Sequence, residues 1–180
     1  MYSFIVWFFV MVLCFRVEAQ DILVDKHSRI SFFSEAPLEN ITAVTEQANS
    51  ALDMGANEIA FKVPIKSFVF KKRLMQEHFN ENYLESDKFP YATFGGKIDS
   101  RINWKADGRH EVVVSGNLEI HGVRKRYTTR ATVEVKDRTI SAHAKFPVRL
   151  ADHGVRIPRV VIKNIAEVVD VDVSSTYQVP

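Results

Sequence analysis

The stretch HEVVVSGNLEIHGVRKRYTTRATVEVKDRTISAHAKFPV, residues 110–148, decides the fold. Apolar and polar side chains alternate along three successive segments of it, at 110–120, 125–136 and 138–148. Alternation with a period of two is typical of β-strands that bury one face and leave the other in water. Only the dipeptides at 121–122 and 137–138 separate these strands, and connections so short predict antiparallel hairpins.

Weaker copies of the same pattern lie on both sides of this stretch. They predict strands at 59–65, 91–104 and 169–177, and less clearly at 22–35 and 39–51. Pro64 indicates an edge position, a bulge or a local break in the strand pairing, and Gly95–Gly96 indicates a bend. About eight antiparallel strands with one apolar face and short turns favour an all-β fold, either a closed barrel or a sandwich.

One segment, KKRLMQEHFNENYLE at residues 71–85, has helical spacing instead. Its apolar side chains recur on one helical face, at Leu74, Met75, Phe79, Tyr83 and Leu84. The pattern predicts one short amphipathic helix of about three turns, which ends before Pro90. Because the outward faces of the strands are polar, we expect this helix to cap an open end of a barrel.

The N-terminus carries a different kind of segment. A nearly continuous apolar run covers residues 4–15, and Val17-Glu18-Ala19 follows with the small-residue spacing of a cleavage site. We therefore expect a signal peptide at residues 1–19, a mature domain at 20–180 and a periplasmic or secreted protein without a permanent membrane anchor. The alternatives are a retained anchor, for which the run is short, and a lipid on Cys14.

Charge and motifs argue against several functions. Lys and Arg exceed Asp and Glu only by 24 to 22, so the charge gives no sign of a nucleic-acid partner. The single cysteine lies in the N-terminal run, no Gly-x-Ser-x-Gly occurs, and the six histidines form neither an i, i+4 pair nor a His-Glu-x-x-His motif. We therefore expect no enzyme: no catalytic residues, no metal site and no cofactor.

Two longer motifs carry a family resemblance. They are FKVPIKSFVFKKRLMQEHFNENYLESDKFPYATF at 61–94 and GNLEIHGVRKRY at 116–127. Through them the chain resembles the YceI-like family over residues 21–177. The resemblance implies an exported, eight-stranded antiparallel lipocalin-like barrel, of a kind in which some members hold a long isoprenoid chain. Many of those members have an Arg-Asp-x-His-Leu element where this chain has Gln76-Glu77-His78-Phe79, so the resemblance does not fix the ligand.

The resemblance implies an apolar, isoprenoid-like lipid as the partner, although not which lipid. The interior of an eight-stranded barrel is wide enough either for its own side chains or for one slender molecule. Residues expected to line the lumen and the cap are Phe32, Phe61, Val63, Phe79, Tyr83, Phe94, Trp104, Val112, Val114, Tyr127, Ala131, Ala142, Phe146 and Val171. The alternatives are a barrel enzyme acting on an apolar small molecule and a structural or adhesive surface domain, and a dimer stays open.

Polar residues near a barrel mouth are candidates for contact with a lipid head group. A long loop from Leu150 offers Asp152, His153 and Arg156. The basic cluster of Arg124, Lys125, Arg126 and Arg130 offers charges for phosphate or an anionic surface, but a solvated hairpin start is the preferred explanation.

Overall fold

The computed structural model describes residues 22–35, 40–157 and 166–180. The predicted signal peptide at residues 1–19 lies outside the described residues and stays a prediction. The strands are β1 Ile22–Ser34, β2 Ile41–Asp53, β3 Glu58–Pro64, β4 Val69–Phe70, β5 Tyr91–Ile98, β6 Gly108–Ile120, β7 Val123–Lys136, β8 Thr139–Arg149 and β9 Val168–Gln178. Among the described residues the helical elements are η1 Ile65–Ser67, α1 Arg73–His78, η2 Phe79–Tyr83 and η3 Leu150–His153.

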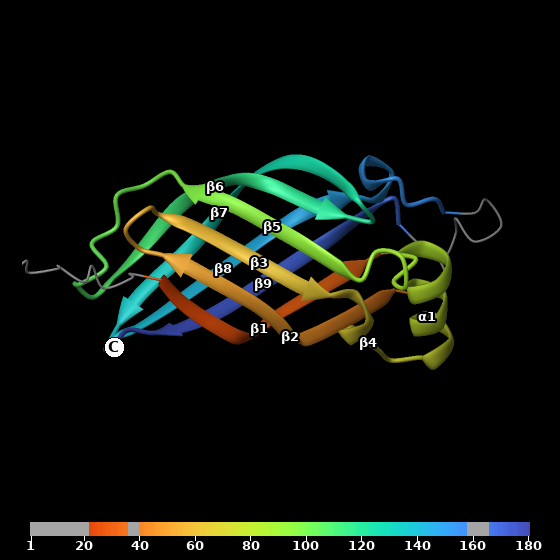
Figure 1. The fold of residues 1–180 in the computed structure, drawn as a ribbon, viewed down its shortest axis with the longest axis horizontal. Helices are drawn as coiled ribbons and strands as arrows, with labels where there is room; N and C mark the ends of the chain where they lie inside the picture. The colour runs from red at the N-terminus through yellow and green to blue at the C-terminus, as the bar shows by residue number, and fades with distance from the viewer. Residues whose placement is uncertain (1–21, 36–39, 158–165) are drawn as a thin grey trace, which may run out of the picture.

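The strands close into a barrel (Figure 1). Their order in the sheet is β1-β9-β8-β7-β6-β5-β3-β2-β4, and an additional antiparallel pairing of β1 with β2 joins the two sides. Among the described residues, the two-residue β4 pairs only with β2, and the other eight strands form the wall. The predicted eight-stranded antiparallel barrel is confirmed, and closure removes the long free edges that an open sheet would expose.

In the central strand β6, the valine side chains predicted to face the interior are buried, and the one predicted to face water is exposed. Val112 and Val114 are buried, at 3% and 8% exposure, whereas Val113 between them is 38% exposed. The less clear strands β1 and β2 are also long, but β1 shifts register between Asp25 and Ser28 and again before Ile30. Such irregularities move side chains to the other face and so hide the period of two.

The strand predicted at 91–104 is too long. β5 ends at Ile98, whose N–H donates to the carbonyl of Asn57, and the next N–H, of Asp99, donates to Val113. The chain then leaves the barrel wall, and Trp104 lies in the connection to β6, where its Nε1–H donates to Asn57 Oδ1 at 3.2 Å. The alternation of apolar side chains in the sequence continues to Trp104, although the chain has already left the sheet.

Gly95 and Gly96, where a bend was predicted, lie within β5 and stay paired with β6, which they approach closely. A Cβ on Gly116 of β6 would lie 2.4 Å from the carbonyl oxygen of Gly95 and 2.6 Å from the ring of Phe94. Glycine is therefore required at 116 by space, and Phe94 lies over the gap that the missing side chains leave.

The predicted helix is confirmed and lies at one end of the barrel (Figure 1). The α-helical turns end at His78, and η2 is a single π-turn in which the N–H of Leu84 donates to the carbonyl of Phe79 at 2.9 Å. The wider turn keeps both Phe79 and the buried Leu84 on the side of the barrel. Within the described part of the chain, no helix has the length and apolar character needed to cross a membrane.

Candidate functional site

The end of the barrel away from α1 is filled by side chains. Leu52, Ile140 and Tyr177 are almost fully buried there, in a cluster that also contains Val112 and is packed against Trp104. Such close packing leaves no room for a ligand at this end. We call Leu52, Val112, Ile140 and Tyr177, with Trp104 packed against them, the closed end.

A buried network of hydroxyl groups fixes the closed end. Tyr177 Oη donates to Ser50 Oγ at 2.8 Å, and Ser28 Oγ lies 2.7 Å from Ser50 and 3.0 Å from Ser175. Ser28 also donates to a carboxylate oxygen of Asp25. Each hydroxyl therefore has a partner, which buried polar groups need, and burial raises the pKa of the Tyr177 hydroxyl.

A cavity of about 580 Å³ occupies the rest of the interior and extends to α1. Volumes of this size are typical of small-molecule sites. Its wall is almost entirely hydrocarbon, and the described lining residues include no Asp or Glu. Inward side chains such as Ala142, Ala144 and Phe146 are only half-buried because they face this space. The barrel is therefore hollow between the closed end and α1.

Twelve of the fourteen side chains predicted for the lumen and cap line the cavity. They are Phe32, Phe61, Val63, Phe79, Tyr83, Phe94, Val114, Tyr127, Ala131, Ala142, Phe146 and Val171. The other two, Val112 and Trp104, lie in or against the closed end, because the sequence does not reveal where along the barrel the filling stops. The part that each side chain has in ligand binding stays a prediction.

The cap contains two aromatic residues that the sequence analysis missed. Phe79 lies 5.6 Å from Phe32, 5.7 Å from Phe68 and 4.9 Å from Phe70, measured between ring centroids. Phe70 lies in the short β4 and Phe68 comes directly before it, and their alternation in SFVF was the available signal. The rings of Phe32 in β1, Phe68 and Phe70 at β4, and Phe79 in η2 thus form one side of the cavity.

Polar contacts join three segments at the α1 end. Glu85 follows the π-turn in a left-handed conformation and accepts a hydrogen bond of 2.6 Å from His121 Nε2. This bond lowers the pKa of the Glu85 carboxyl. The other nitrogen of His121 lies 3.3 Å from the carbonyl of His153, and the ring of Phe89 packs on His121 at 4.5 Å. Gly122, with φ 72°, leaves the space that Phe89 occupies.

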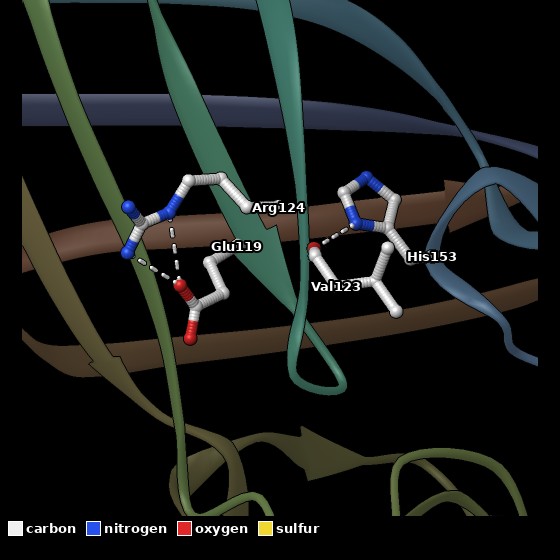
Figure 2. Close-up of polar contacts among 4 residues, drawn as sticks. All are labelled: Glu119, Val123, Arg124 and His153. Carbon is white, nitrogen blue, oxygen red and sulfur yellow. Dashed lines mark hydrogen bonds and ion pairs between the residues drawn. The ribbon is translucent and has the colours of Figure 1, made fainter.

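His153 has a structural role that its sequence position did not suggest. Its ring is fully buried, with Nδ1–H donating to the carbonyl of Val123 at 2.9 Å, as Figure 2 shows. Nε2 is then the acceptor for the hydroxyl of Tyr127 at 3.0 Å. Both nitrogens are used, so the prediction that His153 contacts a head group is not supported. Burial, with Asp152 nearby, raises the pKa of Tyr127.

The other candidates for contact with a head group do not all lie at one place. Arg124 forms an ion pair with Glu119, with Nε and Nη2 at 3.1 and 2.9 Å from one carboxylate oxygen (Figure 2). Lys125 and Arg126 instead line a second hollow together with Asp152. Arg156 is exposed. In the described residues, no group of three or more His, Cys, Asp or Glu side chains is placed to hold a metal ion.

A hollow antiparallel barrel with an apolar interior defines the chain as a lipocalin-like binding fold. Residues 23–177 match the family model of the YceI-like domain, and the chain belongs to this family. Comparison with curated proteins found no match.

Three solved structures are similar to this chain. A polyisoprenoid-binding domain from Saccharophagus degradans is 18% identical, with a TM-score of 0.77, over 90% of this chain and 100% of that one. Burkholderia cenocepacia BcnA is 16% identical, with a TM-score of 0.68, over 83% and 95%. The Campylobacter jejuni YCEI protein is 12% identical, with a TM-score of 0.65, over 81% and 89%. At these identities the likeness shows the fold.

Proposed function

We propose that this protein is an exported carrier or scavenger that holds the chain of one apolar, isoprenoid-like lipid inside the barrel. The observation that carries the proposal is the apolar cavity of about 580 Å³ between the closed end and α1. An empty apolar space of this size is costly to keep in a folded protein, because its lining loses both packing contacts and burial. A ligand that fills it offsets that cost.

The expected affinity can be estimated from the apolar surface that the ligand buries in the cavity. Each Å² of apolar surface removed from water is worth roughly 25 cal/mol, so a chain that buries about 300 Å² gains of the order of 7 kcal/mol before the cost of association. Few polar contacts are then needed, which agrees with the hydrocarbon lining. The polyisoprenoid-binding description of the S. degradans domain supports the same class of ligand.

Binding is favoured over catalysis by the chemistry of the wall. The described lining offers no carboxylate. Its ionisable side chains are Lys72 and His78 at the exposed cap, His143, which pairs with Asp172, and the hydroxyls of Tyr83 and Tyr127. General acid–base catalysis needs such groups beside the substrate, at its reacting atoms. Export rests on the predicted signal peptide at residues 1–19, and its test is the N-terminal residue of the secreted protein.

The binding function is tested by blocking the cavity. Ala144 faces the lumen from β8, whereas Ser141 on the same strand is exposed on the outer face. We expect Ala144→Phe to reduce the affinity of the delipidated protein for 1-dodecanol at least tenfold, measured by displacement of a fluorescent fatty probe. Ser141→Phe adds a similar ring outside and should bind like the wild type. Equal affinity of all three proteins would contradict the proposal.

A further inference from the structure

The barrel wall has a split between β7 and β8. Their ladder ends at the pair Ala131–Ala144, although β7 continues to Val123 and β8 to Arg149. Over these extensions β7 stays paired with β6, and β8 stays paired with β9. Pro147, which has no N–H to donate, lies in this part of β8. We call residues 123–130 of β7 and 145–149 of β8 the seam.

The cavity reaches the seam from inside. Tyr127 and Thr129 on the β7 side and Phe146 and Val148 on the β8 side all line it. The rings of Tyr127 and Phe146 are 6.0 Å apart, and the Tyr127 hydroxyl is held by the buried His153. The wall at this point is therefore made by side chains rather than by a continuous ladder of backbone hydrogen bonds.

A second hollow meets the seam from outside. It is lined by Lys125, Arg126, Arg149 and Asp152, together with Pro147, Val168 and Tyr127. Tyr127 thus belongs to both the cavity and the outer hollow. The outer hollow contains three cationic side chains and one carboxylate, all exposed, so its charge is positive by two. Arg124 is directed instead to Glu119 (Figure 2).

We propose that the outer hollow binds the acidic head group of the ligand, and that the ligand passes the seam beside Tyr127 with its chain in the cavity. This inference rests on the proposed function and names the ligand class: an apolar chain that ends in one carboxylate or phosphate monoester. An ionised head group is too costly to bury unpaired in the hydrocarbon lumen, so it must stay at the surface. Arginine side chains bind planar anionic groups through paired N–H donors, and Lys125 adds a further charge.

The test compares probes that share a chain and differ in the head group. Dodecanoic acid, dodecyl phosphate and 1-dodecanol are titrated into the delipidated full chain at low and at high salt. The wild type should bind at least one acid about tenfold or more tightly than the alcohol at low salt, because charge-assisted hydrogen bonds contribute about this much. Which acid is preferred distinguishes the carboxylate from the phosphate.

Two double variants complete the test. Lys125→Gln/Arg149→Gln removes two charges from the outer hollow, and it should lose the preference for the acid while its affinity for the alcohol stays within twofold. Lys136→Gln/Arg138→Gln removes two exposed charges at the β7–β8 turn, outside the seam and the outer hollow, and should keep the preference. Wild-type protein that binds acid and alcohol equally, or a preference that survives in the first variant, overturns the head-group inference alone. Failure of every probe to bind the wild type overturns the proposed function as well.

Discussion

Phe79→Ala tests whether the aromatic cap holds the barrel end together. Phe79 contacts the rings of Phe32, Phe68 and Phe70 on one side and borders the cavity on the other. Truncation of a fully buried phenylalanine costs about 3–5 kcal/mol. Because Phe79 is only half-buried, we expect a loss of about 2–3 kcal/mol in the free energy of unfolding, which lowers Tm by about 4–12 °C for a domain of this size.

Urea unfolding of the delipidated protein, followed by circular dichroism, measures this loss without the stabilisation that a bound lipid adds. Leu74→Ala is the control, because Leu74 lies on the same helix but is 60% exposed. Its truncation should change stability by less than about 0.5 kcal/mol. If the two variants unfold at the same urea concentration, the four rings do not form a stabilising cap and the reasoning is refuted.

Three further substitutions test the close approach of β5 and β6, the Glu85–His121 contact at the α1 end, and the inward face of β6. Gly116→Ala should cost about 1–3 kcal/mol in urea unfolding, because the new Cβ meets the Gly95 carbonyl, whereas Gly95→Ala meets nothing within 4 Å and should be neutral; equal effects would argue against the close approach. Glu85→Gln should be less stable than the wild type at neutral pH. Because the folded pKa of Glu85 is lowered, the carboxylate stabilises the fold above its ordinary pKa, and the difference should vanish as the pH falls through the lowered value; a difference unchanged in strong acid would refute this. Val114→Asp should cost at least about 3 kcal/mol and reduce bound lipid, whereas the same change at the outward Val113 should do neither; a stable, fully loaded Val114→Asp protein would place the lumen elsewhere.

The sequence was most informative where strands are long and regular. The alternation along β6, β7 and β8 predicted both the hairpins and the inward faces, because one wetted and one buried face impose a period of two. It was least informative in β1, where the bulge near Ser28 shifts the register, and after Ile98, where apolar side chains continue the alternation although the chain has left the sheet.

The residues of the candidate site were likewise predictable only in part. The residues that face the lumen can be predicted from the alternation along each strand. That Val112 and Trp104 belong to the closed end and not to the cavity wall depends on packing between strands far apart in sequence. The role of His153 depends on its contacts with Val123 and Tyr127, about 30 residues earlier, which no local pattern reports. The split between β7 and β8 is also invisible, because each strand keeps its alternation on both sides of the split.

Organic extraction of the protein purified from its native source, followed by mass spectrometry, tests the central claim most directly. The account predicts one lipid with a long apolar chain per protein chain, enriched over a protein of similar size from the same source. The cavity of about 580 Å³ should hold its chain, so Ala144→Phe should purify with clearly less of it. Native protein that yields no bound lipid, or the same amount from Ala144→Phe as from the wild type, would contradict the account.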